Sequence, residues 1–422
     1  MNGGVNMHVT ALGAIIGLII AIILIIRKVH PAYGLILGAI IGGLVGGAGL
    51  LGTVTLMIEG AKGIMPAILR ILTAGVLAGV LIESGAAAKI AESIVDKLGE
   101  SNSLIALALA TLVLTAVGVF VDVSVITVAP IALAIAKRAN LTKTSILIAM
   151  IGGGKAGNII SPNPNAIAAS DTFKIPLTSV MSAGIIPAIG GLIVTCIIAK
   201  KLSKKGSYVK ESEIEESIEE KPKFIAAIVG PLVAIILLAL RPLCNINVDP
   251  LIALPFGGVI GALCMGKIKN VNRYATSGLG KMSGVAILLL GTGTIAGIIS
   301  NSALKDVIIN GISSLGLPAF VLAPIAGILM GGATASTTSG TAVASQVFGP
   351  TILQLGIKPL AGAAMIHVGA TVIDHLPHGS FFHSTGGSVN MDMKERLKLI
   401  PYESLVGLIM TIISTILFGI IV

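Results

Sequence analysis

Amide, hydroxyl and glycine residues interrupt an apolar stretch of the chain that runs from 145 to 170. The stretch is long enough to cross the hydrocarbon core of a bilayer, but its segment 152–165 reads GGGKAGNIISPNPN, which predicts a broken helix. A break leaves backbone N–H and C=O groups unpaired, and a membrane tolerates this only where protein or a wet cavity covers them. Secondary transporters bind their substrates at such breaks. We therefore predict a substrate site formed by Gly157, Asn158, Ser161, Asn163 and Asn165.

A second group of polar residues lies in the other half of the chain. A second interruption falls at 360–383, and seven of the twelve residues 334–345 are serine or threonine. Helix N-termini, free N–H groups and hydroxyls bind carboxylates. We expect these segments to contribute Thr337, Thr338, Ser339 and Thr371 to the same site. The alternatives are proline kinks patched by neighbouring helices and close packing of small residues.

Four ionisable side chains fall at predicted membrane depth: Asp122, Lys155, His367 and Asp374. Burial of such a charged group in a membrane costs free energy unless the group is paired or hydrated, so an ionisable residue at this depth is a candidate functional residue. We predict that they carry the coupling charge, with Asp122 first because it is the only carboxylate between 103 and 138. Lys155 would neutralise Asp122 or meet the substrate carboxylate, and a purely structural ion pair is the alternative. His367 would carry a proton or serve only as an interhelical hydrogen-bond donor.

Composition sets the class of the protein. Of 422 residues, 55% are hydrophobic and 11% are charged, and the mean hydropathy is +1.01. These values predict an all-α polytopic membrane protein in a cell membrane. The net charge of +9 does not indicate a nucleic-acid partner, because the basic residues lie in short loops without a basic stripe and aromatics.

The two halves of the chain repeat each other at an offset of 215–219 residues. Ala149-Met150-Ile151, for example, corresponds to Ala364-Met365-Ile366. A repeat of this length predicts two structural units. We expect a first membrane repeat at 1–199, a charged linker at 200–223 and a second repeat at 224–422.

Each repeat is predicted to hold one hairpin that enters and leaves the membrane on the same side, one broken helix and five crossings in all. The hairpins are 103–138 and 318–350, and the broken helices are 145–170 and 360–383. The remaining crossings are predicted near 8–27, 32–57, 64–83, 177–199, 224–240, 250–266, 283–299 and 402–422. An odd number of crossings makes the repeats inverted, which is the plan of many secondary transporters.

The distribution of basic residues supports this plan. With the linker 200–223 placed in the cytoplasm, 21 of the 28 lysines and arginines lie inside and six lie outside, which leaves Lys155 at membrane depth. The excess follows the positive-inside rule. Both termini are then expected to face outward.

Several segments resemble the gluconate permease family. They are Glu83-Ser84-Gly85-Ala86, Asp122 within 119–122, Pro162-Asn163-Pro164-Asn165-Ala166-Ile167-Ala168, the hydroxyl-rich run 334–345, and Gly379-Ser380-Phe381-Phe382. That family belongs to a wider superfamily of ion transporters with two inverted repeats and paired hairpins. The resemblance implies proton-coupled symport of gluconate or a related sugar acid or hydroxy-carboxylate.

Other classes of function fit the residues less well. We expect no enzyme, because the sequence has no H-E-x-x-H, G-x-S-x-G or nucleotide-binding loop. We expect no cofactor and no metal: His375, His378 and His383 lie near Asp374, but Pro377 disrupts helical ligand spacing. A cation/proton antiporter and a sodium-coupled carboxylate transporter on the same scaffold remain alternatives. The expected partners are the organic anion, a proton or sodium ion, and lipid, with a homodimer left open.

Overall fold

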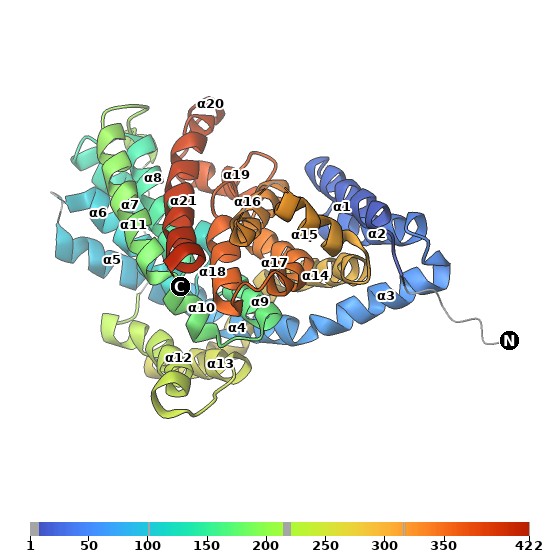
Figure 1. Ribbon diagram of the computed structural model, residues 1–422. Helices are drawn as coiled ribbons and strands as arrows, with labels where there is room; N and C mark the ends of the chain where they lie inside the picture. Colours follow the sequence, from blue (N-terminus) through green and yellow to red (C-terminus); the bar gives the residue numbers. More distant parts are fainter. Residues whose placement is uncertain (1–7, 100–101, 214–220, 315, 317, 422) are drawn as a thin grey trace.

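Helices make up every regular element that the structure describes. The computed structural model describes residues 8–99, 102–213, 221–314, 316 and 318–421 (Figure 1). Within these ranges, the only β pairing consists of two isolated bridges, one of which joins Thr142 to Tyr208. The all-α fold predicted from composition is confirmed.

In the described part of the first half, eleven α-helices precede the linker. They are α1 (Ala11–Ile26), α2 (Pro31–Val45), α3 (Gly49–Gly63), α4 (Met65–Glu83), α5 (Ala86–Leu98), α6 (Ser103–Ala116), α7 (Val121–Arg138), α8 (Lys143–Asn158), α9 (Pro164–Phe173), α10 (Leu177–Ala183) and α11 (Ile185–Leu202).

The second half has a similar order. Its helices are α12 (Phe224–Cys244), α13 (Pro250–Cys264), α14 (Val271–Ser300), α15 (Leu304–Ser314), α16 (Leu322–Thr334), α17 (Thr337–Gln354), α18 (Pro359–Gly369), α19 (Ser380–Ser388), α20 (Met393–Leu397) and α21 (Ile400–Thr415), which continues as a π-helix over Ile416–Ile421. Short 3-10 turns are η2 (Glu211–Glu213), η3 (Ile268–Asn270) and η4 (Ala319–Val321).

Equivalent helices of the two halves pack in the same pairs. The helix α1 packs on α2 as α12 packs on α13, and α6 and α11 flank α8 as α16 and α21 flank α18. In Figure 1, the α1–α2 pair and the α12–α13 pair lie apart, on either side of the other helices. The inversion of the two halves remains a prediction.

Glycine contacts hold the longest helix, α14, against α3 and α4. A Cβ atom added at Gly278 would collide with the carbonyl oxygen of Gly75, and one added at Gly297 would collide with that of Leu56. Small residues allow backbones to approach this closely in membrane proteins. The resulting platform of α3, α4 and α14 supports the hairpin helix α17, which packs on α14.

Two predicted crossings differ from the observed helices. The crossing predicted at 32–57 is split, because α2 ends at Val45, Gly47 adopts a positive φ angle of 90°, and α3 begins at Gly49 with a φ angle of 67°. The crossing predicted at 283–299 is only the second part of α14, which begins twelve residues earlier at Val271. The polar start of α14 hides its helical continuity in a hydropathy pattern.

Among the described residues, five helical stretches are long and apolar enough to cross a membrane: Met65–Glu83, Leu177–Leu202, Phe224–Arg241, Ile268–Ser300 and Met393–Ile421. Six further apolar helices are shorter than this, among them α1, α2 and α6. These shorter helices include α2, which a turn separates from α3, and α18, which ends at the second break.

Candidate functional site

A cavity of about 490 Å³ lies where the two hairpin tips, α14 and the second break meet. The first hairpin contributes Phe120 to Val123, at the turn between α6 and α7, and the second contributes Ala335 to Ser339, at the turn between α16 and α17. Helix α14 contributes Lys281, and the second break contributes Asp374. The cavity therefore brings together segments that are more than 200 residues apart.

The second hairpin presents a helix N-terminus to the cavity. Ala335 adopts a left-handed conformation with φ 46°, and Ser336 then caps α17 by accepting a hydrogen bond from Ser339 N at 3.2 Å. Thr337, Thr338 and Ser339 form the first turn of this helix of 18 residues and line the cavity. Free N–H groups and hydroxyls at such a terminus favour an anion.

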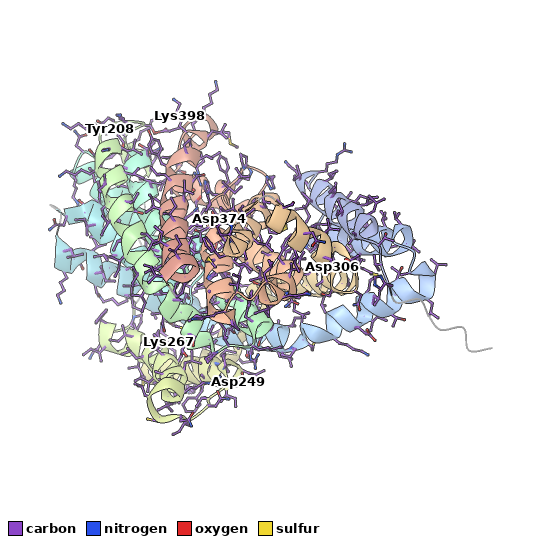
Figure 2. The ribbon with its side chains drawn as sticks, viewed as in Figure 1. Tyr208, Asp249, Lys267, Asp306, Asp374 and Lys398 are labelled. Atoms are coloured by element: carbon purple, nitrogen blue, oxygen red, sulfur yellow. The ribbon has the colours of Figure 1, made fainter. Side chains whose placement is uncertain are left out.

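The two breaks are joined by a buried ion pair. Lys155 Nζ lies 2.6 Å from Asp374 Oδ1, 2.6 Å from the carbonyl oxygen of Thr371 and 2.8 Å from His375 Nδ1. The other carboxylate oxygen of Asp374 accepts a hydrogen bond from Thr337 Oγ1. Asp374 therefore ties the second break to both α8 and the second hairpin tip. Figure 2 shows Asp374 near the middle of the molecule.

Further buried charges continue from this pair toward α20 and α21. His375 Nε2 lies 3.1 Å from the carbonyl oxygen of Ile400, and its Nδ1 lies 3.9 Å from Glu403 Oε2. Glu403 in turn forms a buried ion pair with Arg396, whose Nε donates to the carbonyl oxygen of Phe382 at 3.2 Å. Two cations and two carboxylates thus balance each other around His375.

The first break is closed by its own asparagines. Asn163 Nδ2 donates to the carbonyl oxygen of Asn158 at 2.7 Å and to Asn158 Oδ1 at 2.6 Å, while Asn163 Oδ1 caps α9 by accepting from Ala166 N at 3.1 Å. Asn165 Oδ1 accepts from Thr338 Oγ1 at 2.5 Å. These bonds pair the carbonyl group of Asn158 and the N–H group of Ala166, and they link the break to the second hairpin tip.

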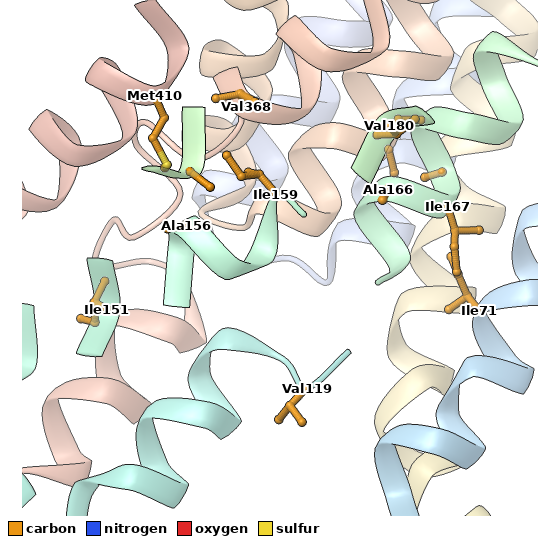
Figure 3. Packing of buried hydrophobic residues seen from close by; sticks show 14 of the residues in the cluster. Ile71, Val119, Ile151, Ala156, Ile159, Ala166, Ile167, Val180, Val368 and Met410 are labelled. Atoms are coloured by element: carbon orange, nitrogen blue, oxygen red, sulfur yellow. The ribbon is translucent and has the colours of Figure 1, made fainter. Parts of the chain in front are cut away.

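The break itself is shorter than the sequence suggested. Residues 152–158 remain in α8, and the helix is interrupted only from Ile159 to Asn163. The glycines serve packing: a Cβ atom added at Gly153 would collide with the carbonyl oxygen of Ala108, and one added at Gly157 would collide with Thr115 Oγ1. Apolar side chains such as Ile159, Val368 and Met410 pack around the two breaks (Figure 3).

The predicted partnership of Lys155 with Asp122 is not observed. Lys155 is engaged by Asp374, and the cation that acts on Asp122 is Lys281, which lines the same cavity. Asp122 Oδ1 accepts a hydrogen bond from the backbone N–H of Val123 at 2.9 Å. Asp122 is therefore held at the start of α7 and faces a lysine of α14 across the cavity.

Six of the predicted site residues line the cavity: Asp122, Asn158, Thr337, Thr338, Ser339 and Asp374. The others do not: Lys155, Gly157, Ser161, Asn163, Asn165, His367 and Thr371. Lys155, Asn163, Asn165 and Thr371 instead make the hydrogen bonds described above, which hold the breaks in place. Ser161 Oγ and His367 Nε2 are buried and have no hydrogen-bond partner among the described residues.

The family model that describes the GntP family permeases matches this sequence over residues 8–421. This chain belongs to the GntP permease family. This GntP family permease is 67% identical, over 98% of its length and 99% of the other protein, to an uncharacterized transporter of Haemophilus influenzae. It is 23% identical to a gluconate permease of Bacillus licheniformis, over 84% of this chain and 87% of that one. The resemblance stated from sequence motifs is confirmed, and the chain is a multi-pass membrane transporter, not an enzyme.

A solved structure supports the fold of this GntP family permease. The YdaH transporter of Alcanivorax borkumensis matches it with a TM-score of 0.63 at 16% identity, over 89% of this chain and 90% of that one. At this identity the match establishes a shared fold and nothing about substrate.

The cavity of this GntP family permease is also lined by Lys281, which sequence reasoning missed. It is lined as well by Ser336, Ser380 and Phe381, which lie in segments that the sequence singled out but which were not predicted as site residues. Lys281 is the only lysine or arginine among the described residues that line it. Its position just before a predicted crossing was the available signal, but a hydropathy pattern assigns such a lysine to a loop.

Proposed function

We propose that this permease is a proton-coupled symporter of a small organic anion, a sugar acid or a related hydroxy-carboxylate. The observation that carries the proposal is the composition of one cavity. It combines the N-terminus of α17, several hydroxyl groups, a single lysine and the carboxylate of Asp122.

The hydroxyl groups and Lys281 suit the two ends of such a substrate. Lys281 would pair with the substrate carboxylate, since charge-assisted hydrogen bonds are roughly twice as strong as neutral ones. Ser336, Thr337 and Ser339 line the cavity and would bond the substrate hydroxyls at the first turn of α17. One relative, the gluconate permease of Bacillus licheniformis, is named for such a substrate.

Coupling would follow from competition for Lys281. Lys281 and Asp122 line the same cavity, and the positive charge of the lysine favours the ionised form of this carboxylate. A substrate carboxylate that draws Lys281 away leaves Asp122 in a buried site without its cation, which favours uptake of a proton. Substrate and proton would then be carried together.

The predicted orientation makes this an inward-open state. The cavity is lined by His30, Lys281 and Ser380, which lie toward the predicted cytoplasmic side. At the predicted outer side, Arg70 of α4 bonds Asp171 of α9 and Asp249 at the start of α13, with Nε 2.9 Å from Asp249 Oδ1. These contacts would close the outer path and would open in the outward-facing state.

Competition for uptake tests the substrate class. Purified protein in proteoliposomes is given labelled gluconate together with unlabelled gluconate, glucose or hexanoate. We expect unlabelled gluconate to compete with the labelled substrate. Glucose and hexanoate should compete weakly, because glucose lacks the carboxylate and hexanoate lacks the hydroxyl groups. Equal competition by glucose would contradict an anion site, and absence of any gluconate uptake would contradict this substrate.

A further inference from the structure

We propose that the ammonium group of Lys155 is a tethered cation that fills a cation-coordinating nest at the second break, and that it thereby makes transport independent of sodium. The nest is formed by Asp374, the carbonyl group of Thr371 and His375. The proposal deepens the proposed function and rests on it, because occupancy of the nest affects coupling only in a protein that transports its substrate together with a cation.

The donors around Lys155 Nζ are those that would otherwise bind a cation. A carboxylate oxygen and a main-chain carbonyl oxygen lie at 2.6 Å each, and a ring nitrogen lies at 2.8 Å. Hard cations take carboxylate and carbonyl oxygens. In secondary transporters, unwound carbonyls and the C-terminal ends of half-helices at a break coordinate the coupling cation.

The position of the nest relative to the helices also favours a cation. Thr371 follows the last residue of α18 by two positions, so its carbonyl group lies at the negative end of that helix. Lys155 itself lies in the last turn of α8. A side chain from the end of α8, just before the first break, therefore brings a positive charge to the negative end of α18 at the second break.

His375 is compatible with this role as a neutral ring. Its Nε2 lies 3.1 Å from the carbonyl oxygen of Ile400 and 3.2 Å from Ser404 Oγ. A proton on Nε2 satisfies the carbonyl group and leaves Nδ1, which also lies 3.0 Å from Asp374 Oδ1, as an acceptor for Lys155. The neutral tautomer thus completes the nest.

Charge balance explains why the nest must be occupied. The charged groups facing it are Asp374 from the break, Glu403 from α21, Arg396 from α20 and Lys155 from α8. Among the described residues, α17 contributes the hydroxyl group of Thr337 to the nest. Two cations balance two carboxylates, so removal of Lys155 leaves one uncompensated negative charge in a buried site, which a small cation can neutralise.

A sodium titration of a lysine variant tests the proposal without any substrate. The thermal unfolding of the purified full-length protein is measured in sodium chloride and in choline chloride of equal ionic strength. The proteins compared are the parent, Lys155→Ala, and Lys269→Ala as the matched control, an exposed lysine of η3 outside both the nest and the cavity. We expect sodium to raise the melting temperature of Lys155→Ala by several degrees in a saturable manner, and to leave the parent and Lys269→Ala unchanged relative to choline.

Identical melting of Lys155→Ala in the two salts would overturn the proposal. If that variant does not fold, the parent protein decides the question. A saturable sodium shift of its melting temperature, or uptake driven by a sodium gradient while Lys155 is intact, would also overturn the proposal. A parent whose melting and uptake are both insensitive to sodium would support the proposal. The melting curves require no transported anion. A failure of the proposed substrate therefore leaves this test unaffected.

Discussion

Lys155 and Asp374 are 219 residues apart in the sequence, yet Lys155 Nζ lies 2.6 Å from Asp374 Oδ1 in the interior of the protein. Their side chains are 1% and 7% exposed. The pair joins the two broken helices, one from each half, so it links the halves at the level of the cavity. A pair this deeply buried depends on both members being present.

Single and double substitutions should therefore differ. Loss of one partner of a buried pair leaves an uncompensated charge and costs about 3–5 kcal/mol, whereas neutral replacement of both costs much less. We expect Lys155→Met and Asp374→Leu each to lower the free energy of unfolding more than the double variant does. Denaturant unfolding in detergent, in choline buffer, measures this. A double variant whose loss equals the sum of the two single losses would show that the pair contributes nothing as a pair.

Lys281 should determine the affinity for the anion. Removal of a charge-assisted hydrogen bond costs about 1.5–3 kcal/mol, or roughly tenfold or more in affinity. We expect Lys281→Gln to raise the apparent KM for gluconate by that factor and Lys281→Arg to restore most of it. Lys269→Gln, on the loop before α14, is the matched control and should change nothing. An unchanged KM in Lys281→Gln would place the carboxylate elsewhere.

Asn163 should act on stability and hardly on affinity. It caps α9 and bonds both the carbonyl group and the side chain of Asn158, but it does not line the cavity. Loss of an N-cap costs about 0.5–2 kcal/mol. We expect Asn163→Ala to lower the melting temperature while KM stays near the parent value. A large rise in KM with no change in melting would mean that Asn163 contacts the substrate directly.

The linker should loosen from the membrane helices at acidic pH. Lys143 Nζ at the start of α8 lies 2.7 Å from Glu213 Oε1 and 2.9 Å from the carbonyl oxygen of Asn390. Burial raises the pKa of Glu213, but the hydrogen bonds from Lys143 and from the backbone of Lys210 outweigh it, and its pKa lies below the usual value. The contact is then fully present above the ordinary pKa of glutamate, about 4.3. It is lost as the pH falls through the lowered pKa of the docked residue.

Amide hydrogen exchange of residues 203–213 measures this loosening as a function of pH. Glu213→Gln should raise exchange at neutral pH and remove its dependence on acid. Glu211→Gln, whose side chain is 83% exposed, is the control and should behave as the parent. A parent whose linker exchanges at the same relative rate across the acidic range would contradict the role of Glu213.

Much of the architecture could be predicted because glycine, proline and hydroxyl residues are unusual in apolar stretches. The turn before Asp122 and the turn before Thr337 fall inside the predicted hairpins, and both broken stretches are interrupted. The limits of the first break were wrong, since sequence alone does not distinguish a glycine that ends a helix from one that permits close packing. Gly153 is of the second kind.

The partners of the charged residues were harder to predict. A repeat aligns equivalent segments, but the partner of Lys155 depends on how two broken helices approach each other, which no local pattern encodes. Lys281 precedes the predicted crossing 283–299, and the polar first turns of α14 resemble a loop in a hydropathy pattern. Its role becomes visible only when Asp122 lies across the same cavity.

The coupling role of Asp122 is the central claim, and one comparison of uptake modes tests it most directly. Proteoliposomes with the parent or Asp122→Asn are assayed for gluconate accumulation driven by an inward proton gradient and for exchange of labelled against unlabelled gluconate without a gradient. We predict that the parent performs both and that Asp122→Asn loses accumulation while it retains exchange. Accumulation by Asp122→Asn with the pH dependence of the parent would contradict the account.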